Sequence, residues 1–316
     1  MSALSSPEQL HPERLARRET PWQRGRLSPW MGPKQLLFGH MYEDCERIEG
    51  RYFPAGGRVF SIASAGSTAI FLAADHHVTA VDMNPVQLDY ARRRSRGALP
   101  ERGVVERLLA RGRRFYRLSG WERESLDTFL EMEDPREQVP YWNERLNTTM
   151  FRAGMDALFS RLLMRMAYSW RFLGALPKHF GLVLRERLER TWSTHANRDN
   201  PYVHALLAGE IPPARRTARA LDVEFAVADA ANYLEACRRG SFDAFTFSNI
   251  LDGVSPAYRR RLFAATRRAA AANAVVILRS FAQPTGSEIR NVAAEDRSPL
   301  WGVVDVRPVE SLQDAA

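Results

Sequence analysis

Small and acidic side chains stand between residues 63 and 82 at a spacing that suits the binding of a nucleoside. The loop 63–67 reads Ala-Ser-Ala-Gly-Ser, and it lies between an apolar run and a helical pattern. Small side chains let the main chain approach a ligand, and the N–H groups at the start of a helix point towards it. Asp82 ends the next apolar run, sixteen residues after Gly66. A carboxylate in that position accepts both hydroxyl protons of a ribose.

The composition of the loop distinguishes between nucleoside cofactors. It contains a single glycine, so the Gly-x-Gly-x-x-Gly pattern of dinucleotide sites is absent. NAD and FAD are therefore disfavoured, because their pyrophosphate needs a tight glycine-rich turn. S-adenosylmethionine (SAM) has no phosphate, and its ammonium and carboxylate groups suit a looser loop that contains serine. We predict a SAM site here; an ordinary junction between a strand and a helix has the same pattern.

Polar residues also follow two later predicted strands. Asp229 ends the third strand, where its carboxylate suits either an adenine amino group or the N-cap of the next helix. The fourth strand ends in 248–252, with Asn249 and Asp252 at the place where a doubly wound sheet presents side chains to its ligand crevice. A turn before the helix that begins near Ser255 is the alternative interpretation.

The order of elements predicts an α/β protein. Residues 58–94 have the pattern strand, helix, strand, helix; residues 95–219 have only helical patterns; and the alternation resumes after 220. We expect a parallel, Rossmann-like sheet of the class I SAM-dependent transferase type with a large helical insertion. The expected domains are a lead-in and helix (1–50), a SAM-binding domain (51–94 plus 220–316) and an acceptor-binding insertion (95–219). Asn84 before Pro85 and Ser255 before Pro256 each predict a capped helix start.

Nearly all of the positive charge is arginine. The formal net charge is +8, and Lys34 and Lys178 are the only lysines. Arginine richness often reflects genome composition, but it also suits an anionic partner, either a phospholipid surface or a nucleic acid. The arginine clusters lack the interleaved aromatic residues of nucleic-acid sites, so we expect peripheral contact with an anionic membrane and no nucleic acid.

Other features predict a cytoplasmic protein without a metal. No apolar run is long enough to span a membrane, and the first residues lack the pattern of a signal peptide. Cys45 and Cys237 stand apart and predict free thiols rather than a disulfide. No cluster of acidic residues and histidines has the spacing of metal ligands, and no pattern indicates an oligomeric state.

Several segments resemble a known family. They are FGHMYEDCERIE (38–49), the strand and helix units of 58–94, DNPYVHALLAGE (199–210) and FSNILDGVSP (247–256). Together they resemble the 3-amino-3-carboxypropyl transferases of betaine-lipid biosynthesis over most of residues 36–285. The segment 38–49 is the most specific, because generic methyltransferases lack such an element before the cofactor domain.

The resemblance implies transfer of the 3-amino-3-carboxypropyl group of SAM to an acceptor hydroxyl, with release of methylthioadenosine. The implied acceptor is a diacylglycerol-like lipid. The chain departs from the family in its shorter length and at His40, which stands at a glutamine-like position, so a small metabolite is the alternative acceptor. An ordinary SAM-dependent methyltransferase and a non-catalytic membrane-surface protein are the alternative functions.

Attack by a hydroxyl needs a nearby base or hydrogen-bond acceptor. The predicted catalytic residues are Tyr42, Asp44 and Asp252, with Glu43 a further candidate base and His40, His195 and His204 of second rank. The predicted cofactor-binding residues are Glu43, Ser64, Ala65, Gly66, Ser67, Asp82, Met83, Asn84, Gln87, Asp229, Ala230, Ser248, Asn249 and Ile250.

Overall fold

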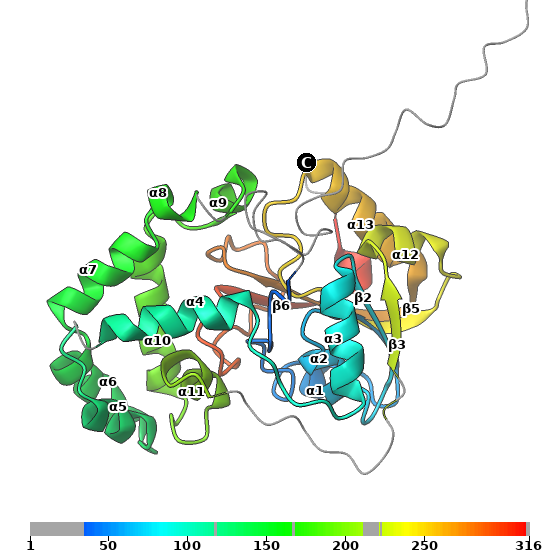
Figure 1. Ribbon diagram of the computed structural model, residues 1–316. Helices are drawn as coiled ribbons and strands as arrows, with labels where there is room; N and C mark the ends of the chain where they lie inside the picture. The colour runs from blue at the N-terminus through cyan, green and yellow to red at the C-terminus, as the bar shows by residue number, and fades with distance from the viewer. Residues whose placement is uncertain (1–34, 117–118, 166–167, 211–220, 222, 314–316) are drawn as a thin grey trace, which may run out of the picture.

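One six-stranded sheet and a group of helices beside it make up the computed structural model, which describes residues 35–116, 119–165, 168–210, 221 and 223–313 (Figure 1). The strand order is β3-β2-β1-β4-β5-β6. The strands are β1 (Arg58–Ile62), β2 (His77–Asp82), β3 (Val223–Val227), β4 (Phe242–Thr246), β5 (Ala270–Ser280) and β6 (Val303–Pro308). The first five run parallel, so the protein is α/β with a mostly parallel sheet, compatible with a Rossmann-like fold.

The last strand differs from the parallel sheet that the sequence predicts. β6 pairs antiparallel with β5, with Val303 opposite Ser280 and Pro308 opposite Val275. Parallel neighbours need a crossover connection, which is usually a helix. The connection 281–302 is described throughout and contains no helix. The chain therefore returns along the edge of the sheet in the opposite direction.

Helices cover both faces of the sheet. The helices α1 (Glu49–Tyr52), α2 (Ser67–Leu72) and α3 (Pro85–Ser95) precede the insertion, and α12 (Ala230–Ala236), α13 (Pro256–Ala269) and the turn η4 (Val309–Ser311) follow it. Side chains alternate between the faces of a strand. Accordingly, Val59 packs in a core with Leu72 and Leu88, whereas Phe60 packs in a second core with Leu234 and Leu262.

The two predicted helix caps are confirmed. The side-chain oxygen of Asn84 accepts hydrogen bonds from the N–H groups of Val86 (3.0 Å) and Gln87 (3.4 Å) at the start of α3. Ser255 Oγ accepts a hydrogen bond from Tyr258 N (3.2 Å) at the start of α13. Both helices begin with proline, whose missing N–H is not needed there.

The described residues between α3 and β3 form helices and no strand. They are α4 (Val104–Arg113), η2 (Arg114–Tyr116), α5 (Arg123–Leu130), α6 (Pro135–Tyr141), η3 (Trp142–Leu146), α7 (Thr149–Leu158), α8 (Arg161–Met164), α9 (Trp170–Ala175), α10 (Phe180–Thr194) and α11 (Pro201–Leu207). Much of this group lies beside the sheet in Figure 1. Its own core includes Phe129, Trp142 and Trp192, all with fully buried side chains.

The apolar spacing of residues 36–49 predicts a helix there, and this prediction is wrong for most of that length. Residues 35–44 form neither helix nor strand, and only α1 is helical. Leu37 N and Phe38 N donate to Gln87 Oε1 (3.1 and 3.2 Å), and Gly39 N donates to Glu106 Oε2 (2.9 Å). These bonds to distant side chains take the place of the i−4 bonds of a helix. The rest of the predicted lead-in, residues 1–34, lies outside the described residues.

Gly66 gives a test of the loop after β1. Its φ is +79°, and an added Cβ would lie 3.0 Å from Ala91 Cβ and 3.1 Å from Ala91 Cα in α3. We expect Gly66→Ala to lower the free energy of unfolding by about 2–4 kcal/mol, from backbone strain and overpacking together. In the matched control Gly56→Ala (φ +67°, nothing within 4 Å of the added Cβ) only the strain remains, about 1 kcal/mol. Urea unfolding measures the free energy of unfolding of both variants. Equal decreases in the two variants would show that contact between residue 66 and α3 is unimportant.

Candidate functional site

Asp82 and the loop after β1 meet at the carboxyl edge of the sheet, as the sequence predicts. Asp82 is buried at the end of β2. Its Oδ2 accepts a hydrogen bond from Ser64 N (3.0 Å), and its Oδ1 accepts one from Asn84 N (2.8 Å). These two main-chain donors fix the orientation of the carboxylate.

The surroundings of Asp82 have the chemistry that a nucleoside requires. Val227 is the register partner of Asp82 at the end of β3, and it is 55% exposed. It supplies an apolar surface beside the carboxylate. Asn84 Nδ2 is buried and has no hydrogen-bond partner among the described residues. An acceptor for hydroxyl groups, an apolar surface for a base and an amide donor without a partner among the described residues therefore lie around one strand end.

Arg94 adds a buried positive charge beside the loop. Its Nη1 donates to Ala65 O (3.1 Å) and Ser67 Oγ (2.9 Å), and among the described residues it makes no ion pair. Burial lowers the pKa of the guanidinium. Arg94 is absent from the predicted site because the run Arg92-Arg93-Arg94 has the pattern of a basic surface cluster. The available signal was helical spacing, which places Arg94 on the same side of α3 as Ala91.

Glu43 lies between the ends of β1 and β4. Its Oε2 accepts a hydrogen bond from Thr68 Oγ1 (3.0 Å) in α2, and its Oε1 accepts one from Ser248 Oγ in the turn after β4. The strand order reverses at this point, which is where doubly wound sheets bind ligands. Burial raises the pKa of the Glu43 carboxyl. A carboxyl group with a raised pKa is a better proton acceptor than an ordinary surface carboxylate.

The neighbours of Glu43 are engaged in holding the structure together. Asp44 is fully buried, and its two oxygens accept hydrogen bonds from Arg297 Nε (2.5 Å) and Nη2 (2.8 Å). Burial raises the pKa of the Tyr42 hydroxyl, and Tyr42 O accepts a hydrogen bond from Trp301 Nε1 (2.7 Å). Neither side chain is therefore well suited to accept a proton from a substrate.

Other predicted site residues form contacts within the protein. Asp252 accepts hydrogen bonds from Ser280 Oγ (2.5 Å) and Phe281 N (3.0 Å), which join the turn after β4 to the end of β5. Asp229 caps α12 through Asn232 N (3.1 Å), one of its two predicted roles, and it also accepts a hydrogen bond from the Tyr258 hydroxyl (2.6 Å).

The remaining predicted cofactor-binding residues are either buried or half-buried. Gln87 is buried and holds the segment before the sheet through Leu37 and Phe38. Ala230 is buried in the core. Met83, Asn249 and Ile250 are half-buried at the carboxyl edge.

A buried ion pair fixes α1 to β5. Arg279 in β5 donates from Nη1 and Nη2 to the two oxygens of Glu49 (2.5 and 2.8 Å), and Thr246 Oγ1 donates to Glu49 Oε1 (2.7 Å). Arg279 Nε lies 3.5 Å from Asp296 Oδ2. Burial opposes ionisation of Glu49, yet Arg279 lowers its pKa. Burial raises the pKa of Asp296 to about 7.

The second-rank histidines have mainly structural surroundings. His40 is buried against the Tyr42 ring, and burial, together with the charge of Arg94, lowers its pKa to about 3. His195 Nε2 lies 3.0 Å from Ala294 O, and His204 Nδ1 lies 3.1 Å from Glu210 Oε2. In the described part of the chain, no group of three or more His, Cys, Asp or Glu side chains is arranged to hold a metal ion. Cys45 and Cys237 are free thiols.

Glu49→Gln tests the buried ion pair. The change removes the negative charge that pairs with the buried Arg279. We therefore expect the free energy of unfolding to fall by about 3–5 kcal/mol. Glu101→Gln breaks an ion pair with Arg93 in which the side chains are 48% and 49% exposed, and it is expected to cost about 1 kcal/mol or less. Chemical denaturation of both variants measures the difference. A loss for Glu49→Gln as small as that of the control would contradict the role given to the pair.

Comparisons of this chain with models of protein families and with curated proteins found no match.

Proposed function

We propose that this protein is a SAM-dependent transferase whose co-substrate binds at the carboxyl edge of β1 and β2. The observation that carries the proposal is the position of Asp82, bonded to the loop through Ser64 N (3.0 Å) and adjacent to the exposed Val227. The carboxylate would accept the ribose hydroxyl protons, and Val227 would contact the adenine. The unpaired Asn84 Nδ2 would donate to the nucleoside.

The amino-acid half of SAM matches the charges farther along the same edge. Arg94, buried beside Ala65 and Ser67, would attract the carboxylate of the co-substrate. A charge-assisted hydrogen bond to a guanidinium is among the stronger polar contacts. Because the loop carries one glycine and no pyrophosphate signature, this arrangement favours SAM over a dinucleotide.

We further propose that the group transferred is 3-amino-3-carboxypropyl. Two observations support this choice: the resemblance of 38–49 to the aminocarboxypropyl transferases, and the position of Glu43 from that segment between Thr68 and Ser248. The acceptor oxygen bonds to the Cγ of the methionine moiety and the Cγ–S bond breaks. The electron pair of the broken bond stays on the sulfur atom, and methylthioadenosine leaves. The hydroxyl proton passes to Glu43. The acceptor is a hydroxyl of a lipid or a small metabolite.

Asp82→Asn tests the co-substrate site. Loss of the carboxylate removes the charged acceptor for the ribose, so the affinity for SAM should fall by at least about tenfold. Asp89→Asn is the control, because Asp89 is exposed on α3 and pairs with Arg93 on the surface. Isothermal titration calorimetry measures both, with thermal unfolding to verify that each variant is folded. No binding by the unchanged protein, or equal binding by Asp82→Asn, would refute the site.

Glu43→Gln separates proton transfer from co-substrate binding. If Glu43 accepts the proton, kcat should fall by roughly 10²- to 10⁴-fold while KM for SAM changes little. Glu46→Gln is the control on the same segment, since the Glu46 side chain is 67% exposed. A raised KM with an unchanged kcat would show instead that Glu43 binds the co-substrate.

A second candidate function, docking on an anionic membrane, is favoured by the surface of α8 and α9. Leu162 and Trp170 are 77% and 76% exposed. No aspartate or glutamate occurs from residue 157 to 185, whereas Arg161, Arg165 and Arg171 lie beside these apolar side chains in the sequence. Exposed tryptophan and leucine with surrounding arginine are typical of segments that lie in a lipid interface.

The place of this surface is compatible with the transferase proposal. A Cβ added to Gly253 would lie 2.5 Å from Phe172 N, so α9 packs closely against the turn that follows β4. The same turn contains Ser248, which bonds to Glu43. No helix in the described residues is both long and apolar enough to cross a bilayer. Contact through α8 and α9 would therefore be peripheral.

The membrane proposal is tested with vesicles of phosphatidylglycerol and phosphatidylcholine. We expect the double variant Leu162→Ala and Trp170→Ala to bind at least about tenfold more weakly, because two large apolar side chains no longer enter the interface. Leu99→Ala is the control, since Leu99 is 82% exposed but lies after α3. Co-sedimentation at increasing salt measures binding. The same affinity for both variants, or binding that salt does not weaken, would exclude this surface.

A further inference from the structure

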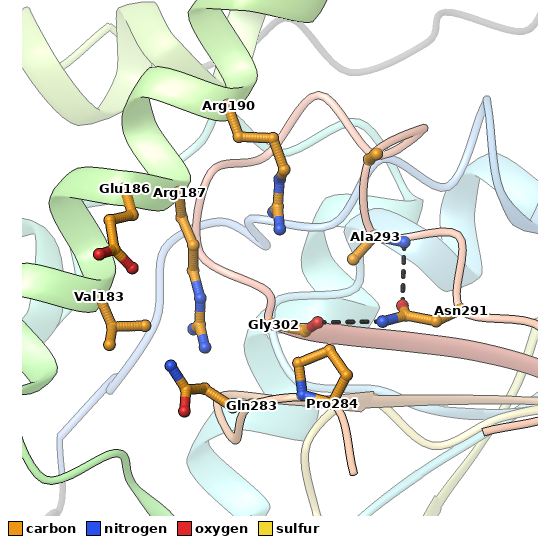
Figure 2. A pocket seen from close by; sticks show the side chains of 10 residues that line it. Val183, Glu186, Arg187, Arg190, Gln283, Pro284, Asn291, Ala293 and Gly302 are labelled. Atoms are coloured by element: carbon orange, nitrogen blue, oxygen red, sulfur yellow. Dashed lines mark hydrogen bonds between the residues drawn. The ribbon is translucent and has the colours of Figure 1, made fainter. Parts of the chain in front are cut away.

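A cavity lies between α10 and the connection 281–302, away from the residues assigned to SAM. Its volume is about 340 Å³, within the usual range for small-molecule sites. Figure 2 shows that the side chains of Arg187 and Arg190 extend from α10 towards the connection. Val183, Glu186, Arg187, Arg190, Gln283, Pro284, Asn291, Ala293, Ala294 and Gly302 line it.

The two arginines are held in place by main-chain oxygens. Arg187 is 4% exposed and donates to Leu300 O (2.9 Å), Phe281 O (2.9 Å) and Ala282 O (3.0 Å). Arg190 donates from Nη2 to Trp301 O (2.9 Å). Among the described residues, neither guanidinium has a carboxylate oxygen within 4.0 Å. Both positive charges are thus oriented without a paired negative charge.

The electrostatic surroundings leave these charges poorly compensated. Burial, and then the charge of Arg190, lower the pKa of Arg187 to about 10. The acidic groups that face the two guanidinium groups are Glu186, which is exposed in the cavity wall, the half-buried Asp252 and the buried Asp296. Burial raises the pKa of Asp252 and of Asp296. Neighbouring like charges favour binding of an anion that neutralises them.

We propose that this cavity binds the carboxylate or phosphate group of a small organic ligand. Arg187 and Arg190 supply the positive charge, and Arg190 retains donors beyond the one bond to Trp301. Asn291 fixes the wall by donating to Gly302 O (3.3 Å) and accepting from Ala293 N (3.1 Å), as Figure 2 shows. Val183 and Pro284 provide an apolar surface for the remainder of the ligand. The assignment goes beyond the transferase proposal and needs no bound SAM.

Two variants with opposite expected effects test the site. Arg190→Gln removes a charged donor and should weaken anion binding by at least about tenfold. Glu186→Gln removes the negative charge in the cavity wall and should strengthen binding roughly twofold. Arg239→Gln is the control, because Arg239 is an exposed arginine before β4, at the opposite end of the sheet. Glu186→Gln keeps the test decisive should Arg190→Gln fail to fold.

Inorganic phosphate and malonate are the probes, titrated separately by calorimetry at constant ionic strength in the absence of SAM. Binding of either probe, weakened in Arg190→Gln, strengthened in Glu186→Gln and unchanged in Arg239→Gln, would support the site. The stronger probe identifies the ligand as a phosphate or a carboxylate. No binding of either probe, or the same affinity in all variants, would overturn the proposal. If the protein binds an anion probe but does not bind SAM, only the transferase proposal is refuted.

Discussion

The buried pair of Glu49 and Arg279 is the interaction on which the carboxyl edge of the sheet depends. Both side chains are fully excluded from solvent, and a buried charge is tolerated only when it is paired and hydrogen-bonded. The pair joins α1 to β5, and Thr246 extends the connection to β4. Because Glu49 is fixed, the six residues before it must follow the end of the sheet, and this brings Glu43 to the gap between β1 and β4.

The same cluster explains why Glu43 differs from its neighbours. Four buried carboxyl groups, those of Glu43, Asp44, Glu49 and Asp296, lie near two arginines, Arg279 and Arg297. The direct ion pairs of Asp44 and Glu49 occupy these arginines. The Glu43 carboxyl group instead accepts hydrogen bonds from two hydroxyl groups among the described residues, those of Thr68 and Ser248. Burial raises the pKa of Glu43, whose carboxyl group lies between Thr68 and Ser248 rather than in a direct ion pair.

Local patterns predicted the sheet better than the site. The alternation of apolar runs with capped helices predicted β1, β2, α3 and α13, because hydrophobic periodicity and Asn-Pro or Ser-Pro caps act over a few residues. Residues 36–44 have a helical apolar spacing, but bonds to Gln87 and Glu106 override it. Such long-range bonds leave no mark in a local pattern. For the same reason Asp44 and Asp252 could be named as candidate catalytic residues, but their hydrogen bonds with Arg297 and Ser280 could not be predicted.

The central claim is that the carboxyl edge transfers the aminocarboxypropyl group of SAM, and analysis of the nucleoside product tests it most directly. The purified protein would be incubated with SAM and hydroxyl acceptors, including diacylglycerol in mixed micelles, and the products resolved by liquid chromatography and mass spectrometry. The proposal predicts methylthioadenosine, with a matching gain in mass on one acceptor. S-adenosylhomocysteine as the only nucleoside product would contradict it and would identify the protein as a methyltransferase.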